Sequence, residues 1–340
     1  MSGESQRVLI DEPSKTAEAR RLTRKMASQI GLDASLAEQS VIVVTEACTN
    51  VLKHAGRGEL ILSGDAGDAQ SPPWLEAIAL DQGPGIRNLN ECLQDGYSSQ
   101  GTAGHGLGAI VRLSKSTDFY SAPGKGTAIL ARWNGATNGY RGRAGHRHLR
   151  ISAVNLPKAG EEVSGDSWAA EQHDDQLTLL VADGLGHGLE ARLASIEAVR
   201  ILRQNPDLPP KALLERCHQA LRSTRGAAVT VAHIDRSREK VAFAGVGNVS
   251  GRIYSGSRLS QNAVSVNGTA GHQCERMQEF YYPWPADGML QVQSDGLTSR
   301  ASLEPYPGLA LRDPSLIAGV LYRDFARGRD DATVVIVKAA

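Results

Sequence analysis

The hydrophobic pattern of the first 133 residues predicts two helices followed by short strands. Between residues 14 and 30, apolar side chains recur every four positions, as on one face of an amphipathic helix. A second helix is predicted to begin at the capping-box pattern Ser35-x-x-Glu38 and to break at Gly56. The remaining predicted elements are strands at 59–63, 74–80 and 128–133 and a short helix at 109–115.

After residue 150 the pattern changes to short apolar strands interrupted by two helices. Predicted strands lie at 177–182, 227–234, 240–244, 289–293 and 332–338, and predicted helices at 189–204 and 211–223. The stretch 134–150 is rich in Gly, Arg and His, shows no period and indicates a linker. We therefore predict an α+β protein with domains at 1–136 and 150–340, joined by a linker at 137–149.

Composition narrows the class of protein. Lys plus Arg and Asp plus Glu both total 37, so the formal charge is zero, which argues against a nucleic-acid-binding or membrane-surface protein. No apolar run approaches the length of a membrane span. The four cysteines are far apart and are interpreted as reduced thiols. A cytoplasmic protein with no membrane partner is expected.

The predicted second helix carries an unusual polar face. Glu46, Asn50, Lys53 and His54 are spaced so that all four lie on one side of a helix. A carboxylate, an amide, an ammonium and an imidazole would make a poor core face. The pattern therefore indicates a candidate site rather than a packing surface.

Two glycine-rich loops follow in the same half. The strand at 74–80 leads into Asp81-Gln82-Gly83-Pro84-Gly85, where glycines let a ligand approach the backbone, although an ordinary turn has the same pattern. The loop 101–108 precedes the predicted helix at 109–115, so it could present free N–H groups to phosphate or be a simple surface loop. Gly126-Thr127 then opens the strand at 128–133.

The order of these motifs resembles the GHKL ATPase superfamily, whose Bergerat fold is an α/β sandwich, and within it the anti-sigma-factor serine kinases. The resemblance covers roughly residues 8–134, and the stretch 93–99 is similar to the switch kinases more than to the sequestering anti-sigma factors. It implies ATP with Mg²⁺, with Glu46 as the general base and Asn50 holding the metal. The implied ATP-binding residues are Asn50, Asp81, Gly83, Gly85, Gly104, Gly106, Leu107, Gly108 and Thr127. Among them Asp81 would accept from the adenine amino group, supported by Thr127, and Gly104–Gly108 would wrap the phosphates.

In the second half, acidic residues stand at strand ends. They are Asp166, Asp183, Asp295 and the pair Asp330-Asp331, each beside Gly or another Asp. Aspartates at strand ends are often only turn formers. Carboxylates gathered at one end of a sheet, however, would repel one another without a cation, and hard oxygen ligands suit Mg²⁺ or Mn²⁺. The number of such positions favours a metal site, with two ions as the usual device for attacking phosphate.

These motifs resemble the protein phosphatase 2C (PPM) superfamily in its sporulation-type branch, whose fold is an αββα sandwich. The resemblance implies two Mn²⁺ or Mg²⁺ ions. Its implied metal ligands are Asp166, Asp183, the Gly184 carbonyl, Asp295 and Asp330. The chain lacks the second acid that larger members carry after Asp166, and either Asp330 or Asp331 could ligate. His187 could assist phosphate binding or pack as a turn residue.

Together the resemblances imply a bifunctional switch protein of a bacterial stress-response, partner-switching pathway. It would combine a serine/threonine kinase with a metal-dependent phosphoserine/phosphothreonine phosphatase. STAS-domain anti-sigma antagonists or stressosome-like proteins are the implied partners, with a sigma-factor regulator as a further candidate. The alternative is a nucleotide-binding module that sequesters a regulator, fused to an active phosphatase.

Overall fold

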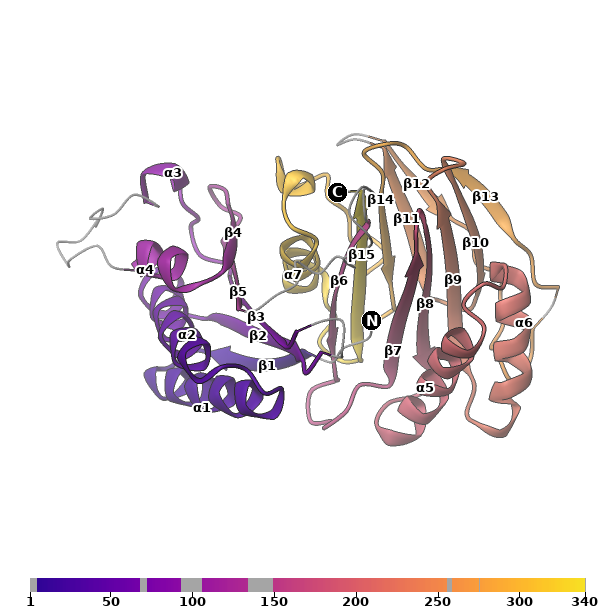
Figure 1. Cartoon of the computed structure of the whole chain (residues 1–340), viewed down its shortest axis with the longest axis horizontal. Coiled ribbons are helices and arrows are strands. Elements are labelled where there is room, and N and C mark those ends of the chain that lie inside the picture. Colours follow the sequence, from indigo (N-terminus) through magenta and orange to yellow (C-terminus); the bar gives the residue numbers. More distant parts are fainter. Residues whose placement is uncertain are drawn as a thin grey trace. The chain divides into compact units, whose positions relative to one another are not determined.

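The computed structural model describes residues 5–67, 72–92, 106–133, 149–255, 259–274 and 276–339. The chain forms two compact units, which are described one at a time (Figure 1). The first comprises Ser5–Ala136 together with Pro305–Arg323, and the second comprises Met1–Glu4, Thr137–Glu304 and Asp324–Ala340. The switch-kinase-like stretch 93–99, Gly104 and residues 137–148 of the linker predicted at 137–149 lie outside the described residues. The last residue of that predicted linker, Leu149, begins a strand.

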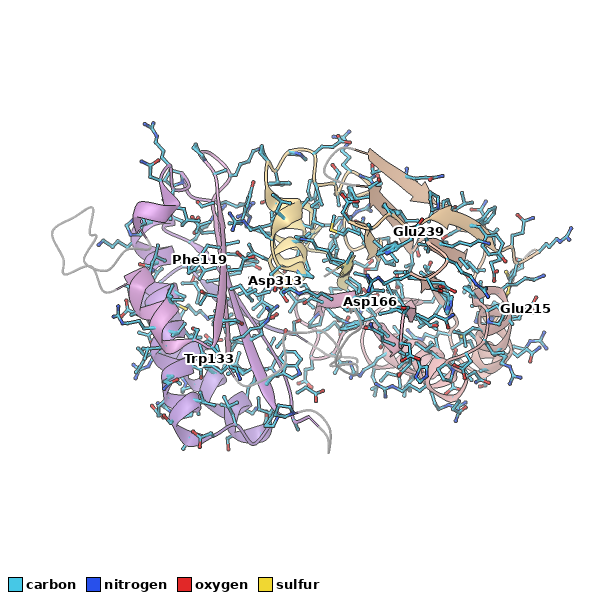
Figure 2. All side chains as sticks on the ribbon, turned by 45° about the horizontal axis from the view of Figure 1, so that its top comes forward. Phe119, Trp133, Asp166, Glu215, Glu239 and Asp313 are labelled. Carbon is cyan, nitrogen blue, oxygen red and sulfur yellow. The ribbon has the colours of Figure 1, made fainter. Side chains whose placement is uncertain are left out.

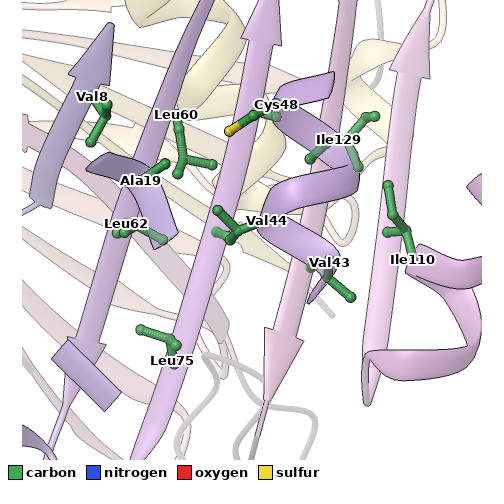
Figure 3. Packing of buried hydrophobic residues seen from close by; sticks show 14 of the residues in the cluster. Val8, Ala19, Val43, Val44, Cys48, Leu60, Leu62, Leu75, Ile110 and Ile129 are labelled. Atoms are coloured by element: carbon green, nitrogen blue, oxygen red, sulfur yellow. The ribbon is translucent and has the colours of Figure 1, made fainter. Parts of the chain in front are cut away.

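The first unit is built on an antiparallel sheet in the order β1-β2-β3-β5-β4. Its elements are β1 (Ser5–Ile10), α1 (Pro13–Gln29), α2 (Ala34–Ala55), β2 (Gly58–Asp65), β3 (Trp74–Asp81), α3 (Leu89–Cys92), α4 (Gly106–Leu113), β4 (Ser116–Ser121) and β5 (Thr127–Trp133). Apolar side chains of α1, α2 and α4 pack on one face of this sheet. Figure 3 shows Val44 and Cys48 of α2 beside Leu60 and Leu75 of the strands, all of them buried.

The opposite face of this sheet is covered by a helix from far along the chain. That helix is α7 (Pro314–Phe325), which follows the short 3-10 turn η2 (Leu309–Leu311). Side chains alternate along β3, so that Ala77 and Ala79 join the core under α1 and α2 while Ile78 and Leu80 point the other way. Gly319 of α7 lies against Ile78 and Leu80. Both faces of the sheet are therefore buried, which explains why β3 and β5 are apolar almost without interruption.

The start of α2 differs from the predicted capping box. The N-cap is Asp33, whose carboxylate accepts hydrogen bonds from the N–H groups of Ser35 and Leu36 at 2.9 and 3.4 Å. Glu38 instead pairs with Arg24 of α1. The capping-box prediction is wrong because an aspartate two residues earlier already satisfies the free N–H groups.

A buried ionic network joins β3, β5 and the segment that begins α7. Arg132 donates to Glu76 at 2.5 Å and to both oxygens of Asp313 at 2.6 and 2.7 Å. Ser315 donates to the same Glu76 oxygen at 2.8 Å. Arg132, Glu76 and Asp313 are all less than 10% exposed, so each charge depends on its partners rather than on water. Asp313 is labelled in Figure 2.

Replacing Arg132 with Met should destabilise the protein by about 3–5 kcal/mol, because Glu76 and Asp313 would stay buried without their cation. Urea denaturation of the full chain measures the effect. The matched control is Arg24→Met, which removes an ion pair whose side chains are at least half exposed and should change the midpoint little. Equal midpoints for the two variants would contradict the prediction.

The second unit contains two antiparallel five-stranded sheets in the orders β13-β10-β9-β8-β7 and β12-β11-β14-β15-β6. The first sheet comprises β7 (Asp166–His173), β8 (Gln176–Gly184), β9 (Ala227–Asp235), β10 (Lys240–Val246) and β13 (Phe280–Pro283). The second comprises β6 (Leu149–Leu156), β11 (Ser250–Ser255), β12 (Leu259–Ala263), β14 (Met289–Gln293) and β15 (Ala332–Ala339). One apolar core fills the space between the sheets.

A second apolar core lies between the β7-to-β13 sheet and two helices, α5 (Leu189–Gln204) and α6 (Pro210–Ala220), which leads into the 3-10 turn η1 (Leu221–Ser223). The α+β class is confirmed. No helix in the described part of the chain has the length and apolar composition needed to span a lipid bilayer.

Two candidate active sites

Helix α2 presents the polar face of the first candidate site. Glu46 and Asn50 are both half-buried, one turn apart. Gly106, the first residue of α4, lies so close to Asn50 that a side chain there would start 3.4 Å from the amide oxygen. Among the described residues, the Asn50 Nδ2 group is buried without a hydrogen-bond partner. The start of α4 thus lies against the middle of α2 at Asn50, whose side-chain amide nitrogen can still donate a hydrogen bond.

Asp81 ends β3 and is fixed by main-chain groups. Its Oδ1 accepts hydrogen bonds from the N–H groups of Gly83 at 2.8 Å and Thr127 at 3.1 Å. No described group forms a hydrogen bond with its second oxygen, Oδ2. Burial raises the pKa of Asp81, and the two N–H donors oppose that rise. The Thr127 hydroxyl hydrogen-bonds to Ser121 instead, so the main chain of Thr127 holds the aspartate.

The glycines around Asp81 are required by close packing. Gly85 has a φ of +74°, and a side chain there would start 2.1 Å from the Ala122 carbonyl oxygen. Arg323, at the end of α7, donates to the Asp81 carbonyl at 2.7 Å and to the Lys125 carbonyl at 2.8 Å. No sequence pattern in the first half pointed to Arg323, because it lies 242 positions after Asp81.

These residues fit a magnesium nucleotide. An amide one turn from a carboxylate can supply an oxygen to a hard cation, and the unpartnered Asn50 Nδ2 can donate to an anionic group. The free oxygen of Asp81 can accept from an amino group. Glu46 has no hydrogen-bond partner among the described residues, which leaves its carboxylate available as a base. Gly104 lies outside the described residues, whereas Gly106, Leu107 and Gly108 form the first turn of α4.

The second candidate site lies where strands of both sheets of the second unit end or begin. Asp166 opens β7 directly opposite Asp183 at the end of β8. Asp295 follows β14, and Asp330 precedes β15, which pairs with β14. The four sequence-predicted carboxylates are thus near enough to influence one another. Asp166, which is labelled in Figure 2, is 1% exposed.

Mutual repulsion and burial perturb these carboxyl groups. Burial, opposed by the Ser294 hydroxyl, raises the pKa of Asp166 to about 7. Burial and the charges of Asp166, Asp295 and Asp330 raise the pKa of Asp183 well above its usual value. The pKa of Asp295 is raised mainly by burial and then by Asp330. Such a cluster would be relieved by a cation.

Two hydrogen-bond donors hold individual carboxylates of the cluster. The Ser294 hydroxyl donates to Asp166 Oδ2 at 2.7 Å, and Asn248 Nδ2 donates to Asp295 Oδ2 at 2.6 Å. The sequence assigned no role to either residue. Ser294 stands beside Asp295 in the chain, which was a usable signal, but Asn248 comes from the loop after β10 and only the fold brings it near.

The two adjacent aspartates, Asp330 and Asp331, have different surroundings. Asp331 is 3% exposed, and its two oxygens accept from the N–H groups of Lys158 at 2.8 Å and Gly165 at 3.0 Å. Asp330 is less buried, and its negative charge raises the pKa of Asp183 and of Asp295. Asp331 therefore joins loops of the unit, and Asp330 has the freer carboxylate.

The donor set suits hard divalent cations, because anionic oxygens dominate it. In the described ranges, no three His, Cys, Asp or Glu side chains lie close enough together to bind one metal ion without moving. The carboxyl groups of Asp166, Asp183 and Asp295 nevertheless lie close enough to perturb one another's pKa. His187 pairs with Glu161 at 2.6 Å on the surface.

Comparisons with known proteins match the two halves of the chain to two different families. A family model described as a histidine kinase-like ATPase domain matches residues 10–133, and one described as stage II sporulation protein E matches residues 173–340. Serine/threonine-protein kinase RsbT of Bacillus subtilis is 32% identical over 113 residues, covering 33% of this chain and 84% of RsbT. Phosphoserine phosphatase RsbX of the same organism is 25% identical over 152 residues, covering 45% of this chain and 76% of RsbX.

Solved structures match the phosphatase fold. A crystal structure of RsbX in complex with magnesium has a TM-score of 0.51 at 21% identity, covering 59% of this chain and 98% of that one. A structure described as "The bacterial stressosome: a modular system that has been adapted to control secondary messenger signaling" has a TM-score of 0.52 at 23% identity, covering 56% and 98%.

Fold and sites thus define a GHKL-type ATPase domain joined to a PPM-type phosphatase domain. The chain belongs to the RsbT-like branch of the histidine kinase-like ATPase family through its N-terminal half, and its residues 173–340 match the model of the SpoIIE family.

Proposed function

We propose that the chain is a bifunctional switch protein that phosphorylates serine or threonine residues of STAS-domain regulators and removes phosphate from phosphoserine or phosphothreonine. The observation that carries this proposal is that one chain contains two separate candidate active sites. The first is formed around Glu46 and Asn50, and the second is the carboxylate cluster around Asp183. The similarity to a kinase and to a phosphoserine phosphatase supports opposing activities. The likeness to RsbT, to RsbX and to the structure titled for the bacterial stressosome supports regulators of that kind as partners, in a cytoplasmic stress pathway.

In the kinase reaction, Glu46 would orient the substrate hydroxyl and take its proton, while Asn50 would hold Mg²⁺ and the first turn of α4 would face the phosphates. Bound Mg²⁺ would neutralise charge that develops on the transferred phosphoryl group. Asp81 would accept a hydrogen bond from the adenine amino group through the oxygen that no described protein group occupies.

In the phosphatase reaction, Asp183 would serve both ions, helped by the Gly184 carbonyl, with Asp166, Asp295 and Asp330 completing the set. The two cations would supply a water of lowered pKa and a clamp on the phosphate oxygens. Asp331 would hold the loops of Lys158 and Gly165 rather than a metal, because both its oxygens are already used.

The two activities can be separated by testing single-site variants against purified STAS-domain proteins. The Asp183→Asn chain, given [γ-³²P]ATP and Mg²⁺, should accumulate labelled STAS protein. The Glu46→Ala chain should fail to label it but should release phosphate from that product when Mn²⁺ is added. Labelling by Glu46→Ala would refute the assigned kinase role. A stable complex with a sigma factor or another regulator, with no STAS protein labelled, would favour the sequestering alternative.

Asn248→Ala should raise the Mn²⁺ concentration needed for half-maximal phosphatase activity by about 10–100-fold, because Asp295 would lose the donor that orients it. Hydrolysis of p-nitrophenyl phosphate during a Mn²⁺ titration measures this shift. Asn262→Ala is the matched control, since Asn262 is on β12 and bonds Arg252 instead. An unchanged Mn²⁺ requirement in Asn248→Ala would show that Asp295 needs no such support.

A further inference from the structure

Arg323 connects the two strands that carry the proposed adenine contact. One guanidinium nitrogen donates to the Asp81 carbonyl at 2.7 Å and lies 3.5 Å from the Thr127 carbonyl, and the other donates to the Lys125 carbonyl at 2.8 Å. Asp81 and Thr127 face each other in the β3–β5 register. The guanidinium therefore bridges the end of β3 and the turn that enters β5.

The same two segments hold the Asp81 carboxylate. Its Oδ1 depends on the N–H groups of Gly83 and Thr127, so its direction depends on the spacing of β3 and β5 at this point. A planar guanidinium can bind two carbonyls at a fixed separation, which an ammonium cannot do. Arg323 is thus placed to set the direction in which the free oxygen of Asp81 points.

The backbone is shaped to admit this side chain. Gly126 has a φ of +66°, and a side chain on it would start 1.9 Å from the Asp81 carbonyl oxygen and 2.9 Å from Arg323 Nη1. Glycine is therefore needed both for the conformation and for the close approach. A larger residue at position 126 would separate the guanidinium from the strands.

Arg323 stands on a helix that several contacts fix to the first unit. Gly319 packs on β3, Tyr322 accepts a hydrogen bond from Arg7 at 2.8 Å, and Asp313 is bound by Arg132 at the start of the segment. The buried side chains run from Pro314 to Tyr322 without interruption. Because α7 is so well packed, the Arg323 guanidinium can hold the end of β3, and with it Asp81, in one geometry.

We propose that Arg323, which belongs by sequence to the phosphatase half, is a positioning residue for adenine recognition by Asp81 in the kinase half. The proposal rests on the proposed nucleotide-binding function of the first unit. Losing Arg323 should weaken binding of bases that carry the amino group more than binding of bases that lack it.

Calorimetric titration of the full chain with ADP and IDP, both with Mg²⁺, tests this claim, because inosine carries a carbonyl where adenine carries the amino group. The unmodified chain should prefer ADP. Arg323→Gln should weaken ADP binding by about tenfold, as for the loss of a hydrogen bond from a charged donor, and should change IDP binding much less. Arg323→Lys should recover part of the preference, since an ammonium can serve only one of the carbonyls well.

Arg312→Gln is the matched control. It removes an arginine of the same segment that bonds Asp118, away from Asp81, and should leave the ADP preference unchanged. Equal weakening of ADP and IDP by Arg323→Gln would overturn the proposal in favour of a purely structural role, and so would unchanged binding. If Asp81→Asn also left the preference intact, the adenine contact itself would be refuted, and the role of Arg323 would fall with it.

Discussion

The Asp183→Asn variant should lose phosphatase activity by more than about 100-fold, beyond the usual loss for residues that only support a metal ligand. Asp183 is the group whose pKa is raised by three neighbouring carboxylates as well as by burial. It therefore lies at the centre of the cluster, where one carboxylate can serve two ions. An amide at this position has no charge to balance them. Hydrolysis of p-nitrophenyl phosphate at saturating Mn²⁺ measures the loss.

Misfolding would not explain that loss, because the substitution should leave the metal-free protein at least as stable. Removing one of several buried like charges relieves repulsion. The thermal midpoint in the presence of EDTA should therefore stay the same or rise. Asp174→Asn, in the exposed turn between β7 and β8, is the matched control and should retain full activity. Activity near that of the unmodified chain in Asp183→Asn would remove it from the metal site.

The Glu46→Gln variant should lower the rate of phosphoryl transfer by about 10²–10⁴-fold, the usual contribution of a general base. Glutamine keeps the shape and polarity of the side chain, so ADP affinity should be almost unchanged. Single-turnover labelling of a STAS-domain protein in the Asp183→Asn background measures the rate without interference from the phosphatase. The expected signature is a loss of rate with retained binding.

Glu38→Gln is the matched control for this result. Glu38 lies on the same helix but pairs with Arg24 on the surface, so its loss should leave the rate unchanged. A parallel loss of ADP binding in Glu46→Gln would show that Glu46 acts in holding the nucleotide rather than in proton transfer. A full transfer rate would remove it from the chemistry altogether.

The helices and strands with strong periodicity were predictable from local sequence. Helix α2 was expected to break at Gly56, and the structure ends it with a left-handed glycine there. Local cues failed at the start of α2, where Asp33 competed with Ser35 for the cap. Strands β1 and β4 were not predicted, because only three of the six residues of β1 are buried and β4 is mostly polar.

The location of α7 could not be predicted, because it depends on contacts between residues far apart in the chain. The one available signal was the nearly continuous apolar run of β3 and β5, which indicates strands buried on both faces. Even so, the partner of the second face was not identifiable. No sequence motif singles out Arg132 or Glu76, and only the fold shows that Asp313 completes their ionic network.

The candidate sites were predictable as far as each residue stood in a motif. Asp166 and Asp183 were recognisable because each adjoins a glycine at a strand end, and the antiparallel register places them opposite each other. Asn248 and Arg323 stand in no motif, because their roles come from where the fold carries them. Side chains that ligate are thus easier to read from a sequence than side chains that orient the ligating groups.

The position of α7 also affects any attempt to divide the protein for separate expression. A fragment cut in the stretch 134–148 would carry every motif of the ATPase yet expose Ile78 and Leu80 to water and leave Arg132 and Glu76 without Asp313. Such a fragment is expected to aggregate or to recruit a substitute surface. A better-designed fragment would append residues 305–323 through a new connection, so that the excised ATPase keeps the distant segment that completes its own unit.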